Sequence, residues 1–185
     1  MKKIAAVALA LCLPALALGA EFEGVKIPDT VQAGGKTLAL NGNGLRTKLF
    51  FKVYVASLYL ENKNADANAV VNADTVKRVR MTMLRDLTKD QIAEAIREGF
   101  EKNAKPQMPK LKDRMESFIS QIPAAVKKGE ILELTYVPGK GTSVGSTSGE
   151  ATQIAGKDFA DALFSVWLGK SPVDENLKKG MLGGK

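Results

Sequence analysis

The candidate functional group of this sequence is an arginine that lies between a glycine-rich stretch and a long, mostly apolar segment. Arg46 follows residues 41–44 (Asn-Gly-Asn-Gly) and precedes residues 50–60. A guanidinium offers parallel N–H donors, so this side chain can bind a carboxylate or another oxyanion. It can also pair with a carboxylate of its own fold, and the residue pattern leaves both roles open.

The segment that follows Arg46 is expected to form a central β-strand. Residues 50–60 are rich in aromatic and β-branched side chains, and apolar residues occupy both alternating faces, which predicts that both faces are covered. The glycines of residues 41–44 favour a hairpin turn over a phosphate-binding loop, because no Lys-Ser/Thr pair and no helix follow them. Arg46 should therefore stand on a turn at the mouth of a buried strand.

The remaining elements mix strands and helices. Residues 76–84 alternate between apolar and polar side chains, as a half-buried strand does. Thr88 and Gln91 form a capping box, which predicts a helix that ends near residue 103. The other expected strands cover residues 23–27, 31–33, 37–40, 130–137, 142–148 and 150–154, and the other expected helices cover residues 110–121, 157–168 and 174–182. This order predicts an α+β protein in which helices pack on one face of an antiparallel sheet.

The helix after Thr88 carries a glycine beside its apolar face. The spacing predicts an inner stripe of Ile92, Ala95, Ile96 and Phe100. Gly99 lies next to this stripe, where it costs roughly 1 kcal/mol of helix stability relative to alanine. It either lets another segment approach closely or has no structural role, and the sequence does not distinguish the two.

The first 20 residues have the pattern of a secretory signal peptide. Lys2 and Lys3 precede an apolar run over residues 4–13, and small residues follow up to Ala20. The apolar run is too short to span a membrane. We therefore expect residues 1–20 to be removed, residues 21–185 to form one domain, and the protein to be periplasmic or secreted, with no transmembrane segment after cleavage.

The absent residue types exclude several kinds of site. The chain has no histidine, and its one cysteine lies within the expected signal peptide. Ser-His and Cys-His catalysis, histidine-ligated metals and disulfides are therefore excluded from the mature protein. Basic residues are scattered, and the densest cluster, residues 77–80, is interpreted as solvated strand faces rather than a nucleic-acid groove. We expect no metal, no cofactor and no nucleic acid.

Three segments of the chain resemble the chalcone isomerase-like family. They are the Arg46 turn with its strand up to residue 61, residues 79–104, and residues 156–182. The resemblance covers almost the whole mature chain. It implies an open-faced β-sandwich fold, in which helices pack on a large antiparallel sheet and a ligand cleft lies between them.

The resemblance also implies a set of ligand-binding residues. In the family an arginine stabilises the anion of the ligand, and threonine, tyrosine, asparagine and serine or threonine complete a polar cleft. Arg46 matches the arginine, but most of the polar partners are replaced by other residues. The implied ligand-binding residues are Arg46, Tyr54, Ile92, Gly99, Val166 and Trp167.

Three functions remain open at this point. The replacements make the chain similar to the non-catalytic, fatty-acid-binding branch of the family, which implies a small apolar acid such as a fatty acid as its partner. The alternative is an isomerase or intramolecular lyase of the chalcone isomerase type, in which Arg46 stabilises an enolate of an unknown conjugated ketone. A third possibility is an envelope interaction module, which predicts a cleft closed by side chains.

Overall fold

The structure is a computed structural model that describes residues 19–146 and 153–184. The expected signal peptide up to residue 18 lies outside the described residues. Residues 147–152, which contain the end of the expected strand over residues 142–148 and the start of the one over residues 150–154, also lie outside them. Of the expected strand over residues 150–154, the described part pairs with the sheet only through a single bridge between Ile154 and Thr142.

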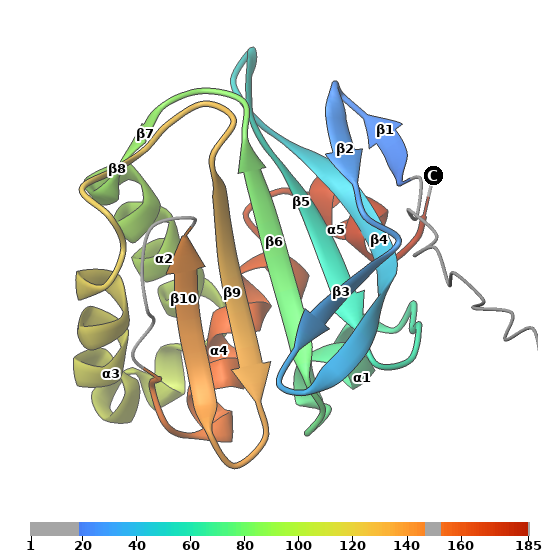
Figure 1. Cartoon of the computed structure of the whole chain (residues 1–185). Helices are drawn as coiled ribbons and strands as arrows, with labels where there is room; N and C mark the ends of the chain where they lie inside the picture. Colours follow the sequence, from blue (N-terminus) through green and yellow to red (C-terminus); the bar gives the residue numbers. More distant parts are fainter. Residues whose placement is uncertain (1–18, 147–152, 185) are drawn as a thin grey trace, which may run out of the picture.

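A curled, six-stranded antiparallel sheet forms the frame of the protein (Figure 1). Its strand order is β10-β9-β6-β5-β4-β3, so the expected central strand, β5, lies in the interior of the sheet. The strands are β3 (Thr30–Ala33), β4 (Lys36–Lys48), β5 (Phe51–Leu60), β6 (Lys77–Met83), β9 (Ile131–Val137) and β10 (Gly141–Ser146). Two short pairs lie apart from it: β1 (Ala20–Phe22) with β2 (Val25–Ile27), and β7 (Leu87–Thr88) with β8 (Ala125–Val126).

The helices cover one face of this sheet, as the sequence predicts (Figure 1). They are α1 (Ala67–Asn72), α2 (Lys89–Asn103), η1 (Lys105–Gln107), α3 (Met108–Ser120), α4 (Lys157–Leu168) and α5 (Glu175–Met181). The capping box is present, since Thr88 and Gln91 satisfy each other's backbone N–H groups at the start of α2. Within the described ranges, no helix is both long and apolar enough to cross a membrane.

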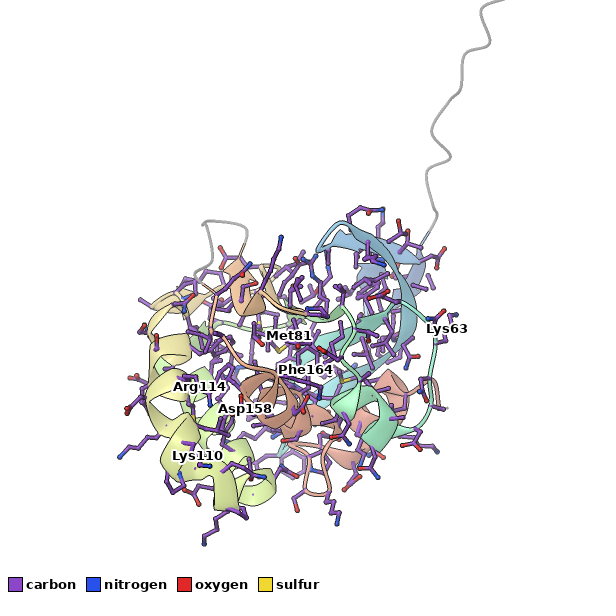
Figure 2. All side chains as sticks on the ribbon, turned by 90° about the horizontal axis from the view of Figure 1, so that it is seen from below. Lys63, Met81, Lys110, Arg114, Asp158 and Phe164 are labelled. Atoms are coloured by element: carbon purple, nitrogen blue, oxygen red, sulfur yellow. The ribbon has the colours of Figure 1, made fainter. Side chains whose placement is uncertain are left out.

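The core lies between the sheet and α4. The alternation predicted for residues 76–84 is confirmed in β6, whose residues on the helix side are buried: Lys77, Val79, Met81 and Met83. Figure 2 shows Met81 and Phe164 of α4 in the interior, while Lys63 and Lys110 lie at the periphery. At the edge of the helical layer, Arg114 of α3 pairs with Asp158 of α4 at 2.7 Å (Figure 2).

The burial of Lys77 corrects the interpretation of residues 77–80 as a solvated cluster. Its side chain is fully buried, and its Nζ donates hydrogen bonds to the carbonyl oxygens of Val70 at 3.0 Å, Val71 at 2.5 Å and Ala73 at 3.0 Å. These carbonyls lie at the C-terminal end of α1, where they accept no backbone hydrogen bond within the helix. The ammonium group therefore holds α1 against the sheet by capping its C-terminus.

The predicted turn at residues 41–44 is wrong. β4 continues through these residues to Lys48, with one register shift between Leu40 and Gly42, and the hairpin turns at Leu49 and Phe50. Arg46 consequently lies within a strand, next to the tip of the β4–β5 hairpin, rather than on a turn after glycines. The prediction that residues 50–60 are buried is also wrong at its start, because Phe50 and Phe51 are exposed.

The glycines of β4 serve a close approach instead of a turn. A Cβ on Gly44 would lie 2.8 Å from the carbonyl oxygen of Leu177, and one on Gly42 would overlap the carbonyl oxygen of Gly180. Both carbonyls belong to α5. The glycines therefore let the backbone of α5 rest directly on β4, which fixes the position of the chain segment next to Arg46.

The inner face of α2 also differs from the predicted stripe. Ile92, Ile96 and Phe100 are buried as predicted, but Ala93 is buried in place of Ala95. Ala95 lines the cavity described below, and the open space beside it leaves its methyl group exposed. The helix is thus rotated so that one edge of its apolar face is not covered by other residues.

Gly99 marks the point where α2 meets α4. A Cβ at this position would lie 2.7 Å from Cγ2 of Val166, well inside the ~3.5–4.0 Å separation of carbon atoms in contact. Of the two roles left open by the sequence, the close approach is therefore the one found. Alanine here would push the two helices apart.

We expect Gly99→Ala to lower the free energy of unfolding by about 1–3 kcal/mol, because the overlap with Val166 outweighs the gain in helix propensity. Urea denaturation measures the effect. The same substitution in a Val166→Ala background should cost much less, since both Cγ atoms are gone. An equal loss in the two backgrounds would contradict the contact.

Candidate functional site

A cavity of about 300 Å³ lies between the sheet and the helices α2 and α4. Its sheet side is formed by alternate residues of neighbouring strands, and its helix side by the inner faces of α2 and α4. The apolar side chains that enclose it include Val53, Met81, Met83, Leu132, Leu134, Ile92, Ile96 and Val166. The interior is therefore suited to hydrocarbon.

Arg46 stands at the mouth of this cavity. It lines both the cavity and a smaller neighbouring hollow of about 180 Å³, and 21% of its side chain is exposed. Its Nη1 donates to the carbonyl oxygen of Thr47 at 2.6 Å and to Oδ2 of Asp174 at 3.3 Å. Its Nε and Nη2 have no hydrogen-bond partner among the residues that the structure describes. The arginine thus has a carboxylate partner in its own fold and still has donors for a ligand.

Asp174 is held in place by other bonds. It is the N-cap of α5, where Oδ1 accepts from the backbone N–H of Leu177 at 3.0 Å. Its Oδ2 also accepts from the backbone N–H of Thr47 at 3.3 Å. The carboxylate therefore connects α5 to β4 even without Arg46, and it touches only one nitrogen of the guanidinium.

A β-bulge brings Val53 to the cavity beside Tyr54, which keeps the alternation of the buried β5 residues Ala56 and Leu58. Arg46 pairs with Tyr54 across β4 and β5, but the next residue, Thr47, pairs with Lys52, so Val53 is an extra residue on β5. A bulge disturbs the alternation of side chains along a strand. This explains why the consecutive residues Val53 and Tyr54 both line the cavity.

The hydroxyl of Tyr54 is positioned by Trp167. The indole Nε1 donates to the phenol oxygen at 3.0 Å, and no described residue accepts the phenol proton. Burial raises the pKa of Tyr54 to about 12, although the Trp167 hydrogen bond and the charge of Arg46 both lower it. The phenol is therefore neutral near pH 7 and offers its proton next to Arg46.

The rim of the cavity holds polar residues that were not among the expected ligand-binding residues. They are Lys48 and Arg85, whose guanidinium carbon lies 5.0 Å from the centre of the Phe51 ring, together with Gln91. Among the described lining residues, every charged side chain is basic: Arg46, Lys48 and Arg85. A positive mouth over an apolar interior suits an anion that carries a hydrophobic tail.

Five of the six expected site residues line this one cavity: Arg46, Tyr54, Ile92, Val166 and Trp167. Gly99 does not line it and instead borders the smaller hollow, where its role is to admit Val166. Lys48 and Arg85 were missed because no sequence signal ties them to Arg46. Only the hairpin and the loop after β6 bring them together.

No group of three or more His, Cys, Asp or Glu residues close enough to hold a metal ion is found in the part of the chain that the structure describes. The groups that can act on a ligand at the cavity are a guanidinium, a neutral phenol and an apolar interior. Together they can bind and orient an acid.

Comparisons with known proteins agree with this architecture. The family model described as chalcone isomerase-like matches residues 19–183. The crystal structure of a fatty-acid binding protein from Arabidopsis thaliana is similar, with a TM-score of 0.64 and 17% sequence identity, over 86% of this chain and 92% of that chain. A search of curated proteins found no match. At this identity the structural likeness concerns the fold.

Proposed function

Because the chain belongs to the chalcone isomerase-like family, we propose that it is an exported, non-catalytic binding protein for a fatty acid or a similar apolar acid. The observation that carries this proposal is the cavity. Its interior is apolar, and all the charged residues that line it in the described part of the chain are basic. The predicted fold, a large antiparallel sheet with helices on one face, is the one observed. The fatty-acid binding protein with the same fold supports the choice of ligand.

The acid group of the ligand would bind at the mouth of the cavity. Nε and Nη2 of Arg46, which have no described partner, favour a carboxylate as the ligand group, because a carboxylate accepts charge-assisted hydrogen bonds. Tyr54 adds a neutral donor, and Trp167 already occupies one acceptor position on its oxygen. The phenol proton is therefore directed away from the indole and is available to the ligand.

The hydrocarbon tail would lie among the apolar side chains of β6, β9, α2 and α4. The volume of about 300 Å³ is at the small end of the range for ligand pockets. This volume leads us to propose a medium-length chain of roughly eight to twelve carbons. Each buried methylene of such a chain contributes about 0.8 kcal/mol to binding before the costs of association.

The two other functions have less support. An interaction module predicts a cleft closed by side chains, whereas the cavity is open. For the isomerase, Arg46 and Tyr54 could stabilise an enolate, but no feature of the cavity favours a conjugated ketone over an acid. Export rests on the expected signal peptide.

The test compares an acid with an alcohol of the same length. The protein is expressed with its own N-terminal segment in a bacterium that can export it, purified without detergent, and examined by native mass spectrometry for a bound small molecule. Titration calorimetry with decanoic acid and 1-decanol follows. We expect the acid to bind at least about tenfold more tightly, because only its head group makes a charge-assisted bond with Arg46.

Two results would count against the proposal. If neither a copurified acid nor added decanoic acid binds, the cavity is not a fatty-acid site. If the acid and the alcohol bind equally well, Arg46 does not recognise a carboxylate, and the cavity is merely a hydrophobic hollow.

A further inference from the structure

The tip of the β4–β5 hairpin is the most hydrophobic exposed feature of the described chain. The large apolar side chains that are exposed among the described residues all lie here: Leu49 at 82%, Phe50 at 96% and Phe51 at 57%. Figure 1 shows this hairpin projecting beyond the ends of the neighbouring strands. Contiguous exposed hydrophobic residues at one place mark a surface that contacts something else.

The backbone at the tip indicates that fold stability does not explain these residues. Leu49 has a φ of 57°, in the left-handed region where glycine or asparagine is favoured. A leucine there is strained, and its side chain is exposed rather than packed. The fold would be more stable with glycine at this position.

The charges around the tip are basic. Lys48 and Lys52 flank the three apolar residues in the chain, and the guanidinium carbon of Arg85 lies 5.0 Å from the centre of the Phe51 ring. Lys52 pairs with Glu23. Lys48 and Arg85 have no ion pair with any residue in the described ranges. Apolar side chains flanked by basic ones are complementary to a bilayer with anionic lipids, where the rings insert and the cations meet the head groups.

We propose that the tip formed by residues 48–52, together with Arg85, docks this protein on an anionic lipid bilayer. A narrow hairpin tip offers too little area for a stable protein interface, which needs roughly 800 Å² on each partner, but it can insert a few side chains into a membrane surface. Leu49, Phe51, Lys48 and Arg85 also line the cavity mouth. Docking through the tip therefore brings the cavity mouth to the lipid surface. The docking itself does not depend on the proposed fatty-acid function. The further step, in which the docked protein exchanges a lipid-derived acid with the membrane, rests on that function.

The test measures partition onto vesicles with matched variants. Each variant is produced with its own N-terminal segment in an export-competent bacterium, and mass spectrometry establishes that all preparations have the same N-terminus. Sucrose-loaded vesicles of phosphatidylcholine, with and without phosphatidylglycerol, are sedimented with the protein. We expect Phe50→Ser to lower partition onto the anionic vesicles at least tenfold. Lys48→Gln should lower it several-fold, whereas Lys63→Gln, an exposed lysine at the other end of β5, should leave it unchanged.

Leu49→Gly separates docking from folding. It should raise the thermal midpoint, because glycine relieves the strained backbone, and yet lower the partition. A purely structural tip would not give changes in opposite directions. In a Phe50→Trp variant, lipids brominated in their acyl chains should quench the new fluorescence, while Trp167 in the wild type, which is buried, should not be quenched.

Several outcomes would overturn this proposal. Equal partition of the wild type and Phe50→Ser would do so, as would no binding of the wild type to anionic vesicles. A dimer in light scattering that becomes a monomer in Phe50→Ser, without vesicle binding, would make a second copy the occupant of the tip. Decanoic acid binding is measured on the same variants without vesicles. Phe50 does not line the cavity. A variant that loses vesicle binding but still binds decanoic acid would therefore leave the proposed function supported. Vesicle binding without decanoic acid binding would refute the proposed function and leave the docking proposal intact.

Discussion

Replacing Arg46 with glutamine should weaken decanoic acid binding by about 30-fold, which corresponds to the roughly 2 kcal/mol of a hydrogen bond to a charged group. Three charged residues line the cavity in the described part of the chain, and of these Arg46 is the one that lies beside Tyr54. Its guanidinium is therefore the expected partner of the acid group. Binding of 1-decanol should change little. Titration calorimetry with both ligands measures the difference.

The folding of this variant should be close to that of the wild type. The pair between Arg46 and Asp174 has one contact at 3.3 Å, and both side chains are partly exposed. We expect its loss to lower the free energy of unfolding by about 1 kcal/mol or less. Asp174 keeps its bonds to Leu177 and Thr47, so α5 should stay in place.

Asp174→Asn is the matched control, because it should act in the opposite direction. Asparagine is an equally good N-cap, so α5 remains capped. Without the carboxylate, Arg46 is no longer partly neutralised, and the affinity for decanoic acid should rise several-fold. If both variants lose stability equally and neither changes acid binding, Arg46 has only a structural role and the binding proposal fails at its central residue.

The second large effect concerns stability rather than binding. Lys77→Met should lower the free energy of unfolding by about 3 kcal/mol, because the carbonyls of Val70, Val71 and Ala73 lose their donor in a buried place. For a domain of this size the thermal midpoint should fall by roughly 6–12 °C. Lys157→Met, which removes a partly exposed pair with Asp161 at 2.6 Å, should cost less than about 1 kcal/mol. Similar losses in the two variants would contradict the buried cap.

The effect of Lys77 should also depend on pH. Burial lowers the pKa of this amine from its ordinary 10.5 to about 8, although the nearby Asp161 carboxylate opposes the change. Between these values the unfolded chain binds more protons at this site than the folded protein does, so this contribution to stability increases as the pH rises from about 8 to 10.5. Wild type and Lys77→Met should therefore differ more at pH 9.5 than at pH 7. A constant difference would mean that the ammonium keeps its ordinary pKa.

The sequence alone determined the fold class and most of the elements. The alternation of β6, the capping box of α2 and the apolar helix α4 were all predicted within a few residues of their observed bounds. These features are local, since a period of two or of 3.6 residues depends only on neighbours in the chain. The similarity in three ordered segments then identified the architecture and placed Arg46, Tyr54, Val166 and Trp167 at a common cavity.

Only the tertiary structure decided what these residues touch. The partner of Arg46, Asp174, is 128 residues away, and Gly42, Gly44 and Gly99 have their roles because α5 and α4 pass over them. The same is true of Lys77, which the sequence indicated as exposed. Periodicity reports which face of an element is apolar, but not which distant segment covers that face or leaves it open. The bulge at Val53 and the uncovered tip at Leu49 and Phe50 depend on strand register and hairpin position, and neither is encoded in the spacing of apolar residues along the chain.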